Sequence, residues 1–329
     1  MTVSANPSRG IPLGFAAICV RSMDESIAFY RDVIGFDVLA RGSAGAEFVA
    51  LLGLPVGTTV EICRLSACGL GIGQLLLLAP NLTGRETVRR KGDRTTRGLW
   101  NINFYVDDIV AVSKALWDRY EFWSEPKRYF VNAESGEAIE VVFEAPDGVA
   151  INLVQPLGDE TTFIGRVRIA AAAFGRTRCG FTPIATTAHC VRSMSEAQRF
   201  YEAMLGVSVV LDAQLGKPET NVFLARPPGS VAHTVFLAGA HFFGKLSLNQ
   251  PLNFEVPDRV NAAQPAAIGY IAQGFFASDI AGATAAALAA GGQTVNAGKM
   301  VLPGFNGEKA VLLRAPGSGA LAWLVEAMT

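Results

Sequence analysis

Three histidines, His189, His233 and His241, are the side chains best able to transfer a proton near neutral pH. His189 lies three residues after Thr186 in a short apolar run, so strand alternation predicts that it faces away from a cavity and packs in the core. His233, in a segment aligned with residues 74–80, is predicted on the cavity side of its strand, where it is the leading candidate for a general base. A structural role for His233 is equally consistent. His241 precedes two phenylalanines in a connector, where it is either a lid residue or a loop contact.

Glu61 is the second catalytic candidate. It stands between Val60 and Ile62 on a predicted strand over residues 59–64, and Arg64 falls on the opposite face. A carboxylate that faced a small cavity would have a raised pKa and could act as an acid or a base. The alternative is an edge charge that faces solvent.

Neutral polar side chains alternate along a predicted strand at Asn101, Asn103 and Tyr105, and therefore share one face. Together with Gln74 and Asn152 they are predicted to bind a substrate by orienting its carbonyl or hydroxyl groups without a metal. The alternative is that these amides satisfy one another or ordered water.

The second half of the chain has a more apolar set of candidates. Thr186, Phe276 and Trp323 are predicted to line a cavity suited to an aromatic ligand, although the same residues could equally fill a barrel core. The connector over residues 239–266 is longer than most loops and is a candidate lid.

An internal repeat organises the chain. The sequence Cys-Val-Arg-Ser-Met occurs at residues 19–23 and again at 190–194, and residues 15–37 match residues 186–208 at 10 of 23 positions without a gap. Hydrophobic periodicity predicts a strand, a helix and then about three strands, twice in each half. The chain is therefore a duplication, with four similar units.

The segment AAICVRSMDESIAFYRDVIGFDV and the later FEAPDGVAINLVQP resemble the opening and closing parts of modules in the vicinal oxygen chelate superfamily, which includes glyoxalase I, extradiol dioxygenases and bleomycin-resistance proteins. The resemblance implies an α+β fold with four βαβββ modules paired into two open-barrel domains. We expect modules 1 and 2 to pair over residues 12–156 and modules 3 and 4 over 183–329. Residues 1–11 are expected to be disordered, and residues 157–182 to form a linker with little of the core.

Members of that superfamily usually hold a divalent metal through a His or Gln on the first strand of a module and a Glu on the last. Aligning strand ends puts the following residues at those positions: Phe15, Asn101, Thr186 and Ala272 on first strands, and Leu76, Asn152, Val235 and Trp323 on later ones. None is a histidine or a carboxylate, so the sequence predicts no metal and no other cofactor.

Composition excludes several kinds of partner. A net charge of −1 and a pI near 6.3 give no reason to expect nucleic acid, and no apolar run is long enough to span a membrane. Five cysteines without metal-finger spacing and a polar start without a signal peptide predict a cytoplasmic location. The partner expected is a small-molecule substrate, and a homodimer is left open.

The leading functional hypothesis is an enzyme with a degenerate metal site that acts by acid–base chemistry, of the lyase, isomerase or hydrolase kind, on a small apolar or aromatic oxygen-bearing substrate. A metal-dependent extradiol-type dioxygenase with misaligned ligands is the first alternative. A non-catalytic small-molecule binding or resistance protein is the second.

Overall fold

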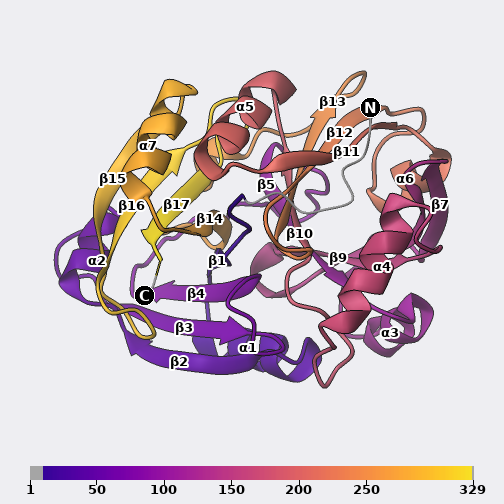
Figure 1. Ribbon diagram of the computed structural model, residues 1–329. Coiled ribbons are helices and arrows are strands. Elements are labelled where there is room, and N and C mark those ends of the chain that lie inside the picture. The colour runs from indigo at the N-terminus through magenta and orange to yellow at the C-terminus, as the bar shows by residue number, and fades with distance from the viewer. Residues whose placement is uncertain (1–9, 328–329) are drawn as a thin grey trace.

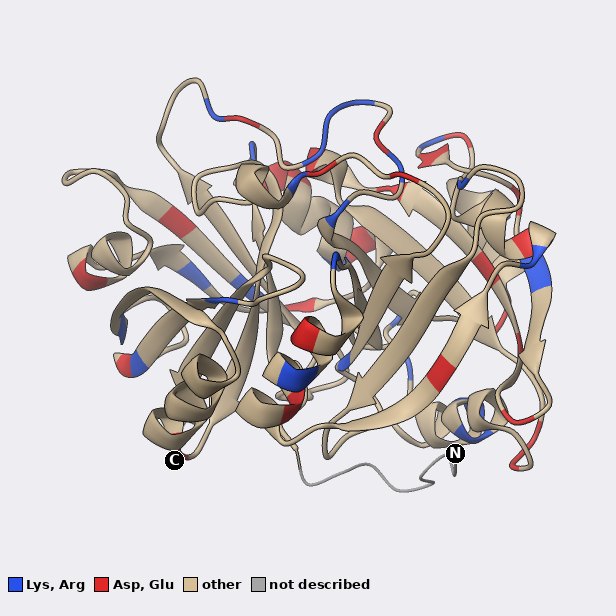
Figure 2. Cartoon of the chain, turned by 90° about the horizontal axis from the view of Figure 1, so that it is seen from above, with Lys and Arg blue, Asp and Glu red and all other residues tan. Residues whose placement is uncertain are grey.

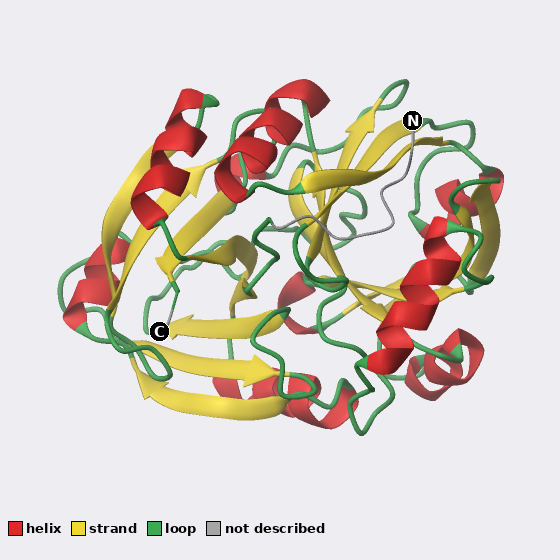
Figure 3. Cartoon of the chain, viewed as in Figure 1, coloured by secondary structure: helices red, strands yellow, loops and turns green. Residues whose placement is uncertain are grey.

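The computed structural model describes residues 10–327 and folds them into two large twisted sheets with helices on their outer faces (Figures 1 and 3). One sheet has eight strands and the other has nine. The order strand, helix and several strands occurs four times, so the mixed α+β class and the four modules predicted from the repeat are confirmed.

The first two modules supply the following elements. Module 1 contains β1 (Phe15–Cys19), α1 (Met23–Ala28), the π-helical turn η1 (Phe29–Val33), β2 (Asp37–Ser43), α2 (Ala46–Leu51), β3 (Val60–Ser66) and β4 (Gln74–Pro80). Module 2 contains β5 (Gly98–Tyr105), α3 (Ile109–Leu116), β6 (Glu121–Phe122), β7 (Lys127–Asn132), β8 (Gly136–Glu144), the 3-10 turn η2 (Pro146–Gly148) and β9 (Ala150–Pro156).

A helix, α4 (Phe163–Ala173), separates them from the last two modules. Module 3 contains β10 (Thr186–Cys190), α5 (Met194–Leu205), β11 (Ser208–Leu215), α6 (Pro218–Phe223), β12 (Ala232–Ala238) and β13 (Lys245–Pro251). Module 4 follows the 3-10 turn η3 (Val260–Ala262) and contains β14 (Gly269–Ala277), α7 (Ile280–Ala289), β15 (Gln293–Met300), β16 (Glu308–Arg314) and β17 (Leu321–Glu326).

The pairing of the modules differs from the sequence-based expectation. Module 1 shares its sheet with module 4, in the order β15-β16-β17-β14-β1-β4-β3-β2, and module 3 shares the other with module 2, in the order β11-β12-β13-β10-β5-β9-β8-β6, with β7 beside β8. In Figure 1 the indigo and violet strands of module 1 accordingly lie beside the yellow strands of module 4. The expected pairs, modules 1 with 2 and 3 with 4, were wrong.

The reason lies in the two central strand contacts. β1 runs antiparallel to β14, and β10 runs antiparallel to β5. All four strands are buried, so burial alone does not select the partner of each strand. The choice depends on how the connectors before β5 and β14 cross between the sheets.

A common core joins the two sheets. The faces of β1, β4, β5, β9 and β13 that point away from the cavities pack with α1, α5 and α7 in one buried cluster. Phe36 and Phe104, from modules 1 and 2, touch edge to face with ring centroids 5.8 Å apart. Gln273 of β14 donates to Thr187 Oγ1 of β10 at 2.5 Å. Contacts of this kind tie the two sheets together.

Two further boundaries need correction. Of the expected disordered N-terminus, residues 1–9 lie outside the described residues, whereas the Ile11 amide donates to the Leu205 carbonyl at 2.8 Å. The expected linker contributes to the core, because Phe163, Val167 and Ala171 of α4 are buried against module 2. A helix that begins with the capping residue Thr162 had been read as a plain connector.

Candidate functional site

The concave face formed by modules 1 and 4 is filled with aromatic side chains. The ring centroid of Phe15 lies 5.7 Å from that of Phe276, 6.2 Å from that of Phe305 and 5.9 Å from that of Trp323. The ring centroid of Phe48 also lies 5.9 Å from that of Trp323. Phe276 and Trp323, both predicted to bind substrate, therefore belong to a packed core.

Gln74 lies in this same filled face. Its Oε1 accepts from Arg64 Nε at 2.8 Å, and its Nε2 donates to the Leu70 carbonyl at 3.1 Å. The Arg64 guanidinium sits 4.9 Å from the centre of the Phe305 ring. Both polar groups of Gln74 are thus engaged within modules 1 and 4, and Gln74 is separated from the other predicted binding residues.

The face formed by modules 2 and 3 encloses a cavity of about 80 Å³. Five residues predicted to bind substrate all line it: Asn101, Asn103, Tyr105, Asn152 and Thr186. The remaining wall is mostly apolar and includes Phe163 and Val167 of α4 together with Phe223 of α6. The structure therefore brings the neutral polar set together across two modules that are distant in the sequence.

Glu140, on β8, is the carboxylate in the cavity wall. Its Oε2 accepts from Asn152 Nδ2 at 2.6 Å, and its Oε1 accepts from the Tyr129 hydroxyl at 2.5 Å. Burial raises the pKa of this carboxyl above the usual range, and the two donated hydrogen bonds partly oppose the rise. Sequence analysis missed Glu140, although its apolar neighbours Ile139 and Val141 carry the signal that had been noticed at Glu61.

Three amide oxygens in the cavity wall have no hydrogen-bond partner among the described residues, and they belong to Asn101, Asn103 and Asn152. On the opposite wall Thr234 donates to Asn249 at 2.9 Å, and Asn249 donates to Ser247 at 3.0 Å, so the module 3 side is internally satisfied. Buried acceptors are costly when unpaired. The module 2 side of the cavity is therefore the side equipped to receive donors from a ligand.

Lys245 is the second residue that sequence analysis missed. It begins β13 beside Thr186, and β13 occupies part of the connector that had been interpreted as a lid. The Lys245 ammonium donates to the Phe242 carbonyl and lies 5.3 Å from the centre of the Tyr105 ring. Burial lowers its pKa to about 7. A buried cation thus stands directly behind the aromatic wall of the cavity.

Neither catalytic candidate from the sequence faces this cavity. His233 Nε2 contacts Asp212 Oδ1 at 2.8 Å on a partly exposed surface, while its neighbours Thr234 and Phe236 line the cavity. Glu61 pairs with Arg41 at 2.7 Å, also with partial exposure. The cavity-facing placement expected for His233 was wrong, whereas Glu61 has the alternative placement, an edge charge that faces solvent.

The error at His233 has a simple cause. The segment containing His233 was aligned with β4, but the structure makes it β12, the equivalent of β3, because β13 follows within the supposed connector. His233 and Glu61 therefore lie at comparable places on corresponding strands. Each pairs with a charged residue of the neighbouring strand, Asp212 on β11 and Arg41 on β2.

The other two histidines are structural. His189 is fully buried, its Nδ1 lies 3.4 Å from the Tyr201 hydroxyl, and burial lowers its pKa to about 3. The packed core position predicted for His189 is confirmed. His241 stacks near Phe174, with ring centroids 4.6 Å apart, and its Nδ1 accepts from the Phe243 amide at 3.0 Å. His241 is thus a loop contact.

Comparison with known proteins agrees with this architecture. The family model described as Glyoxalase/Bleomycin resistance protein/Dioxygenase superfamily matches residues 13–153. Glyoxalase I from Zea mays is similar in structure, with a TM-score of 0.62 and 16% identity over 96% of this chain and 92% of that one. A putative dioxygenase from Bacillus subtilis subsp. subtilis str. 168 has a TM-score of 0.59 and 12% identity over 98% and 87% of the two chains. No curated protein sequence gives a significant match.

Residues 13–153 thus match the model of this superfamily, and the chain over nearly its whole length has the fold of glyoxalase I and the putative dioxygenase.

The residues at the superfamily's metal positions do not fit a metal. In the observed strand register, the four equivalent first-strand positions are Phe15, Thr186, Asn103 and Gly274. Each of these residues lies beside one residue of the adjacent parallel strand. Those partners are Gln74, Lys245, Asn152 and Trp323. The register corrects the alignment at four positions, where Asn101, Ala272, Leu76 and Val235 had been assigned.

Around modules 2 and 3, these positions therefore carry the hydroxyl of Thr186, the amides of Asn103 and Asn152, and the ammonium of Lys245. Around modules 1 and 4, they include the aromatic rings of Phe15 and Trp323. Divalent transition metals prefer imidazole, thiolate and carboxylate donors. Over residues 10–327 the structure contains no group of three or more histidine, cysteine, aspartate or glutamate side chains that could hold a metal ion.

Surface features set few limits on partners. In the view of Figure 2, segments with basic residues and segments with acidic residues are interspersed along the described chain. Within residues 10–327 no helix has the length and apolar character that crossing a membrane requires.

Proposed function

We propose that the cavity between modules 2 and 3 is the active site of an enzyme that works without the superfamily metal, by acid–base chemistry of the lyase, isomerase or hydrolase kind. The observation that supports this proposal best is Glu140. A carboxyl with a raised pKa and two oriented hydrogen bonds is the type of group that enzymes use to move protons.

In this proposal Glu140 takes a proton from a substrate carbon or hydroxyl and later returns it. The hydrogen bonds from Asn152 and Tyr129 favour the charged carboxylate before transfer and hold it in one orientation. The unpaired amide oxygens of Asn101 and Asn103 accept hydrogen bonds from hydroxyl or N–H groups of the substrate. These hydrogen bonds would orient the substrate so that the proton to be transferred lies within reach of Glu140.

The remaining walls suggest what kind of molecule enters. Most of the lining residues are apolar or aromatic, among them Phe163 of α4, Phe223 of α6 and Phe236 of β12, and the open volume is about 80 Å³. The substrate class that fits is a small molecule with an apolar or aromatic body and one or two oxygen-bearing groups.

The proposal is tested with Glu140→Gln, which keeps the size and one acceptor oxygen but removes the titratable carboxyl. Hydrogen–deuterium exchange into a panel of small hydroxy- and keto-aromatic compounds in D₂O reports proton abstraction directly by NMR. We expect Glu140→Gln to lower the exchange rate by about 100-fold or more, while ligand-detected NMR still shows binding.

The matched control is Glu137→Gln on the same strand. Glu137 pairs with Arg128 at the surface, with Arg128 Nε 2.9 Å from its Oε2, so this variant should exchange at the wild-type rate. Full exchange by Glu140→Gln would refute the acid–base role. Oxygen consumption that depends on added Fe(II) would support the dioxygenase alternative, and tight binding without any exchange would support a binding protein.

A further inference from the structure

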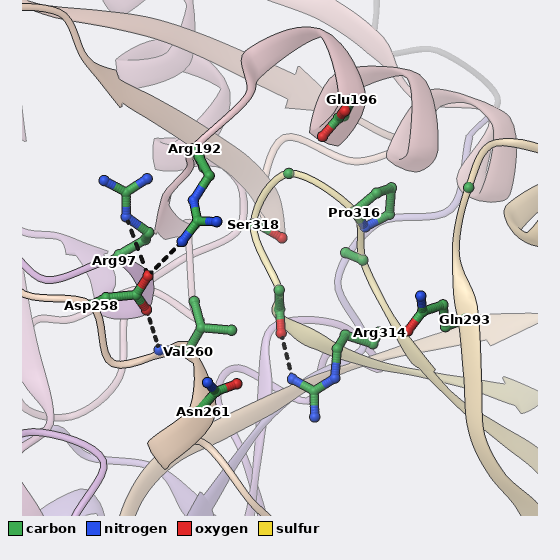
Figure 4. Close-up of a pocket in the computed structure, with 14 residues that line it drawn as sticks. Arg97, Arg192, Glu196, Asp258, Val260, Asn261, Gln293, Arg314, Pro316 and Ser318 are labelled. Carbon is green, nitrogen blue, oxygen red and sulfur yellow. Dashed lines mark hydrogen bonds and ion pairs between the residues drawn. The ribbon is translucent and has the colours of Figure 1, made fainter.

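A second pocket lies at the end of β16, between the loop that follows this strand, η3 and the start of α5 (Figure 4). Its volume is about 400 Å³, and it contains three arginines: Arg97, Arg192 and Arg314. Asp258 and Glu196 are the acidic residues in its wall. None of these residues lines the cavity of the proposed active site.

The three arginines are not equally neutralised. Asp258 accepts from Arg192 Nη2 at 2.9 Å and lies 3.7 Å from Arg97 Nε. Arg314 has no ion pair among the described residues, and its Nη1 donates to the Gly319 carbonyl at 2.9 Å. Figure 4 shows the Asp258 group on one side of the pocket and Arg314 with Gln293 on the other. Burial without a carboxylate partner lowers the pKa of Arg314 below its usual range.

Because the chain is duplicated, module 2 contains a position equivalent to that of Arg314 in module 4. Glu144-Ala145-Pro146 corresponds to Arg314-Ala315-Pro316, and the strand pairs Glu121 with Glu144 and Gln293 with Arg314 match in register. The charge at the end of the strand is therefore reversed between the two copies.

In module 2 the chain satisfies its own acidic residues. Arg94 donates to Glu144 at 2.7 Å and to Glu121 at 2.5 Å, and Arg89 lies 3.7 Å from Glu144. Both arginines come from the connector before β5. At the repeat offset of 171 residues, Arg89 corresponds to Val260, which lies in the second pocket.

The second copy thus has the opposite charge at the strand end, and no described side chain supplies a counter-ion to it. We propose that this pocket binds a small anion, with Arg314 as the principal cation and the Arg192–Arg97 pair as the second contact. The ligand chemistry is a carboxylate or phosphate group, because a guanidinium donates two parallel hydrogen bonds to either.

Isothermal titration of the full chain with inorganic phosphate and with succinate tests the proposal and separates the two sources of the anion. We expect at least one of them to bind at millimolar concentration or below, with affinity that falls as salt increases. Arg314→Gln should weaken binding by at least about 10-fold. Lys309→Gln, an exposed change on the same strand, should bind as the wild type does.

Asp258→Asn gives an independent variant that leaves Arg314 intact. Removing the internal carboxylate frees Arg97 and Arg192, so the anion should bind about 3-fold to 10-fold more tightly. Wild-type protein that binds neither anion at tens of millimolar, or an Arg314→Gln variant with unchanged affinity, would overturn the proposal. Turnover in the other cavity does not enter this measurement, so the two proposals fail separately.

Discussion

Replacement of Lys245 by methionine should stabilise the protein and remove a pH dependence. The Lys245 ammonium is enclosed behind Tyr105, and the pKa falls from 10.5 to about 7 on folding. Because the folded pKa is below the unfolded one, the buried lysine destabilises the fold. The full penalty applies below about pH 7 and is relieved as pH rises towards 10.5.

The magnitude follows from the two pKa values. The penalty is about 5 kcal/mol near pH 6 and about 3 kcal/mol near pH 8.5, so wild-type stability should gain about 2 kcal/mol from this group over that interval. Methionine loses the hydrogen bond to Phe242 and the contact with Tyr105, together worth roughly 1–2 kcal/mol. The net gain expected for Lys245→Met near pH 7 is therefore about 2–3 kcal/mol.

Urea denaturation of the wild type and the variant at several pH values measures both quantities. The difference in free energy of unfolding should shrink by about 2 kcal/mol between about pH 6 and about pH 8.5. Lys299→Met, at an exposed strand position, is the control and should keep the wild-type pH slope. A destabilised Lys245→Met variant, or a difference that does not vary with pH, would refute the argument.

Four other outcomes follow from the same geometry. If Glu140 is the base, the exchange rate should fall as pH decreases through a pKa above the ordinary carboxyl range, and a flat profile in Glu140→Gln would attribute that limb to it. His233→Gln and Glu61→Gln should each retain activity within about 2-fold, since both side chains face outward. A loss of about 100-fold in either variant would show that the active site includes that residue and is not the cavity around Glu140. Dialysis against a chelator should leave activity unchanged, and elemental analysis that finds one transition metal per chain would contradict this. Phe15→Ala should cost about 3–5 kcal/mol in urea denaturation, because it opens a hole between Phe276 and Trp323; a loss below about 1 kcal/mol would mean that this face is loosely packed.

Much of the local structure was readable in the linear chain. The repeat at residues 19–23 and 190–194 identified the duplication, and capping residues such as Ser22 and Ser193 mark the helix starts that follow. Alternation along β5 correctly grouped Asn101, Asn103 and Tyr105 on one face. These features depend on neighbours within a few residues, so composition and spacing carry them.

The identity of the cavity depended on contacts between distant strands. The first strands of modules 1 to 4 are all buried, and burial alone does not specify which of them pair. The pairing of β10 with β5 therefore had to come from the folded chain. That pairing brings Asn152 and Thr186 to one wall and leaves Phe15 against Trp323 in the other face.

One strand assignment shows how a local error spreads. The segment that forms β12 was assigned to the last strand of its module. His233 was therefore predicted to face the cavity, and Lys245 was assigned to a loop although it lies on β13. Side chains alternate with a period of two, so an incorrect register reverses every face of a strand. The sequence therefore determined the modules, the helix caps and the faces within each strand. The partners of the strands, and with them the site around Glu140, were determined by packing between modules, because burial of the strands can be satisfied in more than one pairing until the whole chain is assembled.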